Sequence, residues 1–482
     1  MTKELAFSVS TERNVNRWRV HAVLLVTVAM TLTGISIVNV ALPSIRGDLG
    51  ATDADLQWVL GGYALSFGVT LIPAGRLGDI LGRPRLYLIG IVIFALASIM
   101  AGLAGDMLVL NLARVLQGFG SGILSPQILG MLQQYFQGAE RARALGAYGT
   151  VVAVSMGAAP LLGGLIIDLV GDESGWRWTF FVNIPVSITA VVLALLWFPR
   201  PFGKSRTSDS ERKIELDLVG AAILGVAILF VLFPFAAHIE GFIWLLLPFG
   251  IAMVFGWVAW ERAYKRRGRR PMVDLAIFRE SSFSSGVALA TVYFVGITAV
   301  WVIIAIYVQL GLGMSALHAG LIGLPSAIFG AFSARWAGKH VTTLGRRIVS
   351  VGIVVAITGL LASVIVLHLH AGGHISVWWL LLTLTPVGIA QGAVINPNQA
   401  LTLRSVPLDY AGSSGGVLQT GQRIGSAVGA TVITAILFSV QPIAGWAMAA
   451  TAAFGGIVTS LLVALAISLR DQFRRDVPRV GE

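Results

Sequence analysis

Fourteen long apolar segments constrain the fold of this chain more than any other feature of its sequence. An α-helix needs about 20 apolar residues to cross the hydrocarbon core of a bilayer, and each segment is about that long. The segments lie near residues 20–43, 56–76, 86–105, 107–130, 144–168, 178–198, 217–237, 242–261, 283–310, 317–336, 347–369, 376–398, 412–438 and 443–469. Only 12% of the 482 residues are charged, against roughly 25% in an average soluble domain. The pattern predicts an all-α polytopic membrane protein.

The basic residues predict how these segments are oriented. The chain has 34 Lys and Arg against 23 Asp and Glu, which gives a net charge of +11. Most of the basic residues fall before the first segment, after the last, or in alternate connections. The positive-inside rule assigns such stretches to the cytoplasm, so we expect both termini to be cytoplasmic. The net charge then reflects topology and attraction to membrane lipids, and we expect no nucleic-acid partner.

A charged loop between the second and third segments carries the strongest local signal. Residues 75–85 read GRLGDILGRPR. Two glycines, Gly75 and Gly82, would let two helix ends approach each other closely. Asp79 and Arg83 would lie at the membrane edge, where charged side chains have to be solvated or paired.

The same glycine skeleton returns in the second part of the chain. Gly338 follows Gly75 by 263 residues, and Gly345 follows Gly338 with the same spacing as in the first copy. Thr342 stands in the second copy where the first copy has Asp79. A loop that is repeated in this way predicts two related halves, an arrangement that many secondary transporters have.

Two charged stretches that contain Pro, Gly or Ser divide the chain, and such stretches usually form loops. They cover residues 199–216 and 262–281, with a compact apolar hairpin between them. We predict a six-helix half over residues 1–198, an inserted transmembrane hairpin with its linkers over 199–282, and a second six-helix half over 283–482.

The 75–85 loop resembles the signature loop between helices 2 and 3 of the major facilitator superfamily. Four further stretches resemble motifs of its fourteen-helix drug/proton antiporters, which are multidrug exporters. These stretches are SIVNVALP at 36–43, RVLQGFG at 114–120, APLLGG at 159–164 and WRWTFFVNIP at 176–185. The resemblance implies the major facilitator fold with 14 transmembrane helices, a location in the bacterial inner membrane and proton-coupled drug or antibiotic efflux by a monomer.

The first predicted site is a gate at the cytoplasmic membrane edge. Asp79 can pair with Arg83 and, if the second and fourth helices are neighbours, with Glu140 and Arg141. Such a network could close the inner gate by charge pairing and open it by rearrangement. The alternative is a set of solvated loop charges; the family resemblance implies the gating role.

The second predicted site is a central substrate route. Arg114 and Gln117 begin a polar stripe on one helical face. An arginine inside a span should face the bundle interior or a water-filled cavity, although an arginine that only bonds to carbonyl groups is the alternative. The other candidates are Ser36, Asn39, Tyr293, Trp301, Gln391, Gln419 and Arg423. The aromatic ones could instead face lipid or the membrane interface.

Pro160, Gly163 and Gly164 form the helix-5 motif of the resembled family. A proline can kink a helix, and glycines allow a close helix contact. We therefore predict a mechanical role in the rocking of the two halves, with ordinary glycine packing as the alternative.

An absence among the acidic residues bears on energy coupling. The Asp and Glu residues fall in loops or at helix ends, and Gly34 occupies the position at which the resembled family usually has an aspartate. Proton relays need a titratable side chain. Coupling would therefore require Asp79 or an outer carboxylate such as Asp168 or Glu240. The same absence favours neutral or anionic substrates over cationic ones.

Three functions follow from these observations. The first is a secondary exporter of hydrophobic or amphipathic compounds that works by alternating access and is driven by protons. The second keeps the fold without the coupling, as a facilitator or a flippase for lipids or cell-envelope precursors. The third, a membrane-embedded enzyme, would need a catalytic cluster. Beyond His368, His370 and His374 in an outer loop we find none, so we predict no enzyme, cofactor or metal site.

Overall fold

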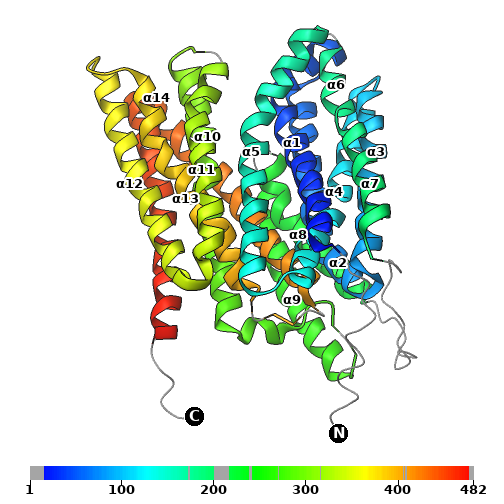
Figure 1. Ribbon diagram of the computed structural model, residues 1–482. Helices are drawn as coiled ribbons and strands as arrows, with labels where there is room; N and C mark the ends of the chain where they lie inside the picture. The colour runs from blue at the N-terminus through cyan, green and yellow to red at the C-terminus, as the bar shows by residue number, and fades with distance from the viewer. Residues whose placement is uncertain are drawn as a thin grey trace.

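The chain forms two bundles of helices that lie side by side in the computed structural model (Figure 1). The structure describes residues 16–171, 174–199, 217–237, 242–269, 271–314, 316–404, 406–407 and 410–476, and no strand occurs among them. The predicted linker residues 200–216 and the predicted turn at 238–241, with Glu240, lie outside the described residues.

The first bundle contains α1 to α7. Their bounds are α1 (Arg17–Leu49), α2 (Asp53–Leu81), α3 (Arg83–Gly102), α4 (Met107–Tyr135), α5 (Gly138–Val170), α6 (Gly175–Phe181) and α7 (Asn183–Trp197). A single residue, Gly82, joins α2 to α3 with a φ of 101°. Side chains with a Cβ rarely adopt that conformation, so the loop requires a glycine there.

The second bundle contains α10 to α14. Their bounds are α10 (Ser281–Ile306), α11 (Ala316–Leu344), α12 (Arg346–Ala371), α13 (Leu380–Thr402) and α14 (Ala411–Asp476), with short turns η2 (Leu275–Arg279), η3 (Tyr307–Gly311) and η4 (Val377–Trp379). Gly345 joins α11 to α12 with a φ of 57°. The repeated glycine skeleton therefore makes the same kind of helix junction in both bundles.

Helix α14 consists of two legs. It is assigned 66 residues, which as one straight helix would be about 100 Å long, whereas a bilayer core is about 30 Å thick. Gly445, with a φ of 77° and a ψ of 177°, interrupts it. The legs pack on each other, because a Cβ on Gly456 would lie 2.9 Å from the Ile433 side chain.

Two further helices, α8 (Leu218–Ala237) and α9 (Leu246–Arg266), follow the first bundle, with the turn η1 (Phe242–Leu245) before α9. They pack on each other, and α8 also packs on α2 and α14. Leu232 of α8 fits against Gly68 of α2, where a Cβ would lie 2.7 Å from the leucine. An apolar cluster that includes Leu65, Leu224 and Leu418 continues this contact into α14.

Many of these helices have the properties of membrane spans. Ten helical stretches of the described residues are long and apolar enough to cross a membrane, and a shorter apolar helix covers Val219–Phe235. Large apolar side chains such as Leu96, Leu169 and Phe255 are exposed on the outside of the bundles, as lipid contact requires. The count of fourteen crossings remains a prediction.

Candidate functional site

The two bundles approach each other most closely at one end, where a pair of glycines meets on each side. A Cβ on Gly75 of α2 would lie 2.6 Å from the carbonyl carbon of Gly412 of α14, and one on Gly338 of α11 would lie 2.7 Å from the Cα of Gly146 of α5. We call this the Asp79 end. Gly75 and Gly338, the first glycine of each predicted loop, thus both allow the close helix contacts at this end.

The carboxylate of Asp79 adds hydrogen bonds between the bundles. Its Oδ1 accepts from the backbone N–H of Gly412 at 2.9 Å, and its Oδ2 accepts from that of Ser413 at 3.0 Å. These N–H groups belong to the first turn of α14, where they have no partner within their own helix. The partial positive charge of a helix N-terminus also stabilises a carboxylate. Asp79 therefore joins α2 to the opposite bundle by charge and by hydrogen bonds.

Arg83 holds Asp79 in this position. Its Nε and Nη2 donate to Asp79 Oδ1 at 3.2 and 2.9 Å, and its Nη1 donates to the Gly130 carbonyl at 3.1 Å and to Gln134 Oε1 at 2.9 Å. The side chains of Asp79 and Arg83 are 1% and 8% exposed. The alternative of solvated loop charges is therefore wrong for this pair.

Glu140 and Arg141 do not join this network. Glu140 forms an ion pair with Arg17 of α1 at 2.7 Å, and within the described residues neither Glu140 nor Arg141 bonds to Asp79. The reason is the packing of the helices, because α5 lies against α1 whereas the end of α2 faces α3, α4 and α14. The expected contact of these two residues with Asp79 is therefore corrected.

The second bundle has a buried arginine at the equivalent position. Arg346 follows Arg83 by 263 residues, like the two loop glycines. Its Nε donates to Asp471 Oδ2 of α14 at 2.6 Å, and its Nη1 donates to Asn398 of α13. The side chains of Arg346 and Asp471 are only 2% and 1% exposed. Both acids accept from an arginine of their own bundle, but Asp79 also accepts from backbone N–H groups of the opposite bundle.

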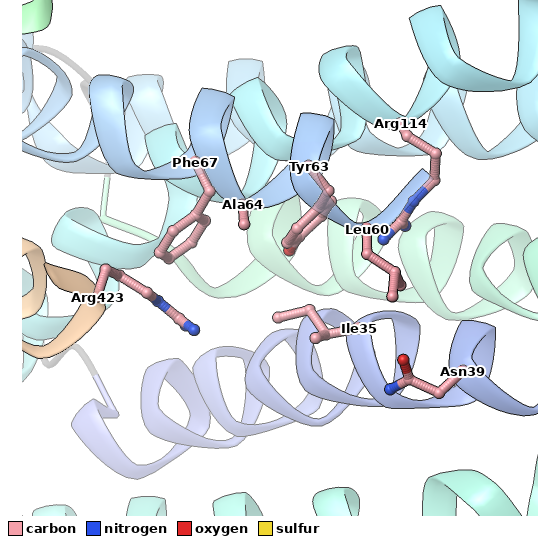
Figure 2. A pocket seen from close by; sticks show the side chains of 8 residues that line it. All are labelled: Ile35, Asn39, Leu60, Tyr63, Ala64, Phe67, Arg114 and Arg423. Atoms are coloured by element: carbon pink, nitrogen blue, oxygen red, sulfur yellow. The ribbon is translucent and has the colours of Figure 1, made fainter. Parts of the chain in front are cut away.

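A central cavity lies between α1, α2, α4 and α14, with a volume of about 200 Å³ (Figure 2). Eight described residues line it: Ile35, Asn39, Leu60, Tyr63, Ala64, Phe67, Arg114 and Arg423. Two of them are arginines and none is acidic. The cavity therefore combines aromatic and apolar walls with a positive charge.

Arg114 is fixed within this wall. Its Nε donates to the Val59 carbonyl at 2.8 Å, and its Nη1 donates to Gln117 Oε1 at 2.8 Å. The guanidinium lies 4.5 Å from the centre of the Tyr63 ring, and the residue is 1% exposed. Arg114 therefore combines the two predicted alternatives: it bonds to a backbone carbonyl, and it also lines the cavity.

Arg423 enters the cavity from the other bundle and is held less tightly. Its guanidinium lies 4.5 Å from the centre of the Phe67 ring, and Figure 2 shows it pointing toward the space between α1 and α2. Within the part of the chain that the structure describes, Arg423 has no hydrogen bond or ion pair.

The remaining predicted route residues do not line the cavity. Gln117 donates to Ser98 at 2.7 Å behind Arg114, and Gln419 accepts from Ser125 at 2.6 Å, which links α14 to α4. Tyr293 lies in the apolar core of the second bundle, and Trp301 packs against that core. Ser36 and Gln391 are partly buried outside the cavity.

The sequence did not predict that α2 lines the cavity. Leu60, Tyr63, Ala64 and Phe67 have the spacing of one helical face, and that face forms a wall of the cavity. An apolar stripe of this kind in a membrane helix is indistinguishable in sequence from a lipid-facing one. Only its position opposite Arg114 and Arg423 identifies it.

The helix-5 motif makes a close helix contact. A Cβ on Gly163 would lie 2.7 Å from the Ile37 side chain of α1, whereas Gly164 has nothing within 4 Å. Helix α5 runs without interruption from Gly138 to Val170, through the position of Pro160. The close helix contact is therefore present, and a kink at Pro160 and the mechanical role of the motif stay predictions.

Two helical bundles around a central cavity that is closed at one end define a secondary-transporter architecture. Residues 24–430 match the family model of the Major Facilitator Superfamily. The chain belongs to the Major Facilitator Superfamily, so the expected superfamily is confirmed.

Individual relatives narrow the class. The chain is 32% identical over 427 residues to the probable actinorhodin transporter of Streptomyces coelicolor, which covers 88% of this chain and 72% of the relative. It is 30% identical over 418 residues to the multidrug resistance protein Stp of Mycobacterium tuberculosis. This match covers 83% of this chain and 72% of the relative. The protein is a multi-pass membrane transporter of the drug-efflux type and not an enzyme.

A solved structure agrees with the fold. The human organic anion transporter MFSD10 (TETRAN) superposes with a TM-score of 0.68 at 14% identity, covering 94% of this chain and 99% of that chain. At this identity the similarity shows the fold alone.

Proposed function

We propose that this protein exports hydrophobic or amphipathic small molecules from the cytoplasm across the bacterial inner membrane by alternating access. The observation that carries the proposal is the bond from Asp79 to the N-terminus of α14, which joins the two bundles at one end only. Opening that end requires these bonds to break, so Asp79 and Arg83 act as the gate. Gly75 and Gly82 shape the loop that carries them.

The Asp79 end is the cytoplasmic end in this proposal. Basic residues such as Arg17, Arg85 and Arg347 lie at helix ends there, whereas Arg46 and Arg177 lie at the opposite end. The positive-inside rule then favours a cytoplasmic location of both termini. The structure would accordingly represent the state that is closed to the cytoplasm.

The chain organisation follows the same proposal. We assign the first transport half to residues 1–198, the inserted transmembrane hairpin to 199–282 and the second half to 283–482, with fourteen spans in total. The packing of α8 on α2 and α14, with α9 on α8, supports this division, and it fits the fourteen-helix antiporter subtype. Because one chain supplies both halves and the cavity, we propose a monomer in direct contact with lipid.

The cavity supports a neutral or anionic amphipathic substrate. Tyr63 and Phe67 offer aromatic surface, and Asn39, Arg114 and Arg423 offer polar groups, the mixture that small-molecule sites usually have. The names of the relatives point to antibiotics and other drugs, and efflux of such compounds would confer resistance.

Proton antiport is the energy source that the family resemblance favours. Asp79 is then the carboxylate that would have to titrate, since no acidic residue lines the cavity among the described residues. Protonation would weaken its bonds to Arg83 and to α14, and this would link proton binding to the opening of the gate.

The second candidate is an uncoupled facilitator or lipid flippase, and the lack of a carboxylate among the described residues that line the cavity favours it. Proteoliposomes with an imposed pH gradient distinguish the two candidates. Proton antiport through Asp79 predicts gradient-driven substrate flux that falls at least tenfold in Asp79→Asn and is retained in Asp168→Asn. The reverse result would assign the coupling to the outer carboxylate Asp168. Substrate flux that ignores the gradient in the unmodified protein would rule out proton antiport and leave the facilitator.

A further inference from the structure

The two arginines of the cavity differ in their bonding, and the difference bears on the substrate. Two hydrogen bonds fix the guanidinium of Arg114 in the wall. Among the described residues Arg423 has no hydrogen bond or ion pair; its guanidinium lies 4.5 Å from the centre of the Phe67 ring, and Tyr63 and Tyr148 are close enough to interact with its charge. Arg114 therefore contributes a fixed positive charge, while the N–H groups of Arg423 are available to a ligand.

A charged guanidinium inside the membrane needs a partner. Charged side chains in this environment pair with one another, with backbone carbonyls or with water, and unpaired ones are costly. Contact with an aromatic face recovers part of that cost. The planar guanidinium fork is also the side chain best suited to bind a carboxylate or a similar oxyanion through two hydrogen bonds. The open position at Arg423 therefore fits an anion.

We propose that the cavity binds planar aromatic anions, such as carboxylates or sulfonates, through Arg423, and that the membrane potential acting on their charge drives their export. This inference rests on the exporter function proposed above, in its uncoupled form, and assigns the substrate class and the driving force of that form. Phe67 and Tyr63 would stack against the aromatic part of the ligand. Arg114 would raise the positive potential of the cavity without releasing its own partners.

The sign of the membrane potential suits this direction of transport. The cytoplasm is negative, so an anion moves outward down the electrical gradient. For a monovalent anion the ratio of external to internal concentration at equilibrium is about 50-fold for each 100 mV, which corresponds to about 2.3 kcal/mol. Such export would need no proton bound to the protein.

The empty carrier benefits from the same field. When the substrate has left, the cavity keeps the positive charges of Arg114 and Arg423. Returning that charge toward the negative cytoplasm is electrically favourable, whereas the loaded step carries less net charge because the anion offsets Arg423. A carrier with this charge arrangement can therefore lack the helix-1 acid, and Gly34 at that position is consistent with it.

Two probes that differ in charge test the proposal. Naphthalene-2-sulfonate is an aromatic anion, and naphthalene-2-sulfonamide has nearly the same shape without the charge. Proteoliposomes with no pH gradient receive a potential from potassium and valinomycin, and radiolabelled probe is measured. We expect the sulfonate to accumulate on the positive side about 50-fold per 100 mV, and the sulfonamide to equilibrate without a response to the potential.

Variants of Arg423 test the binding site separately. Arg423→Gln should weaken sulfonate binding at least tenfold and sulfonamide binding less than threefold. Arg423→Lys, which keeps the charge without the planar fork, should recover part of the sulfonate affinity. Arg85→Gln, a loop arginine outside the cavity, is the matched control and should bind like the unmodified protein.

The outcomes separate this inference from the exporter proposal. Flux of both probes with no response to the potential, or equal losses for both probes in Arg423→Gln, would overturn the anion inference and leave the exporter intact. Flux of neither probe would overturn the exporter proposal for aromatic amphiphiles as well. The potential dependence of the unmodified protein decides the question even if Arg423→Gln fails to fold.

Discussion

The two bundles present the same glycine skeleton at the Asp79 end, but only the first adds a charge to the contact between them. Gly75 meets Gly412 and Gly338 meets Gly146 in equivalent backbone contacts. At the first contact Asp79 bonds to the N-terminus of α14, whereas its counterpart in the second copy, Thr342, is exposed.

The buried arginines sharpen this comparison. Arg83 binds the acid that also bonds to the opposite bundle, whereas Arg346 binds Asp471 within its own bundle. The two ion pairs, Arg83 with Asp79 and Arg346 with Asp471, are similarly buried but differ in the helices that they connect. The first pair includes the acid that bonds to the opposite bundle, and the bond between Arg346 and Asp471 lies within one bundle. Burial of a pair therefore does not define its role; the position of its partners does.

The largest expected effect comes from the close glycine contact that joins the two bundles on both sides of the Asp79 end. Gly75→Ala would place a Cβ 2.6 Å from the backbone of Gly412, so the closed Asp79 end could not form and transport should fall more than tenfold. The chain has no cysteine, so spin labels on Arg85→Cys and Arg347→Cys report the distance between bundles without background. Gly164→Ala is the control, and a normal distance distribution in Gly75→Ala would contradict the steric argument.

The next effect should be confined to the second bundle. Asp471→Asn removes the negative charge from the buried ion pair with Arg346, and such losses cost about 3–5 kcal/mol. We expect a clearly lower melting temperature in detergent and an unchanged distance between the bundles in the folded protein. A shift of that distance would show that Asp471 also contributes to the gate.

A smaller effect, directed at the gate, is expected for Asp79→Asn. Arg83 lies on the same loop, so its pairing with residue 79 survives opening, and only the two bonds to α14 distinguish the closed from the open state. We expect the equilibrium between the closed and open states to shift toward the open state by about 1–3 kcal/mol, a five- to 150-fold change in the equilibrium constant. The same spin-label measurement reports it. Thr342→Val is the matched control, and an equal response of both variants would abolish the difference between the two loops.

The smallest effect is expected at the contact between α5 and α11, which joins the two bundles without a charged group. Thr150 of α5 donates to the Ala331 carbonyl of α11 at 3.2 Å, and also to Gly146 of its own helix. Thr150→Val should reduce closure by less than about 1 kcal/mol, the net value of a neutral hydrogen bond. A loss as large as that of Asp79→Asn would show that the contact between α5 and α11 depends on more than glycine packing.

Local features of the sequence were sufficient for the helices and for part of the site. Apolar length predicted where the helices lie, and the repeated glycines predicted the two junctions at Gly82 and Gly345. The cost of a charge inside a membrane predicted that Arg114 and Arg423 face the interior of the protein. Each of these properties acts within one helix or one loop, so a single stretch of sequence expresses it.

The tertiary structure alone decided which side chains meet. Asp79 binds residues 333 and 334 positions away, and Arg346 binds an acid 125 positions away. It also separated the fixed Arg114 from the available Arg423 and turned the apolar face of α2 into a cavity wall. Hydropathy and helical periodicity fix what each helix contains, but they do not fix which faces pack together, since that depends on the fit between helices distant in the chain.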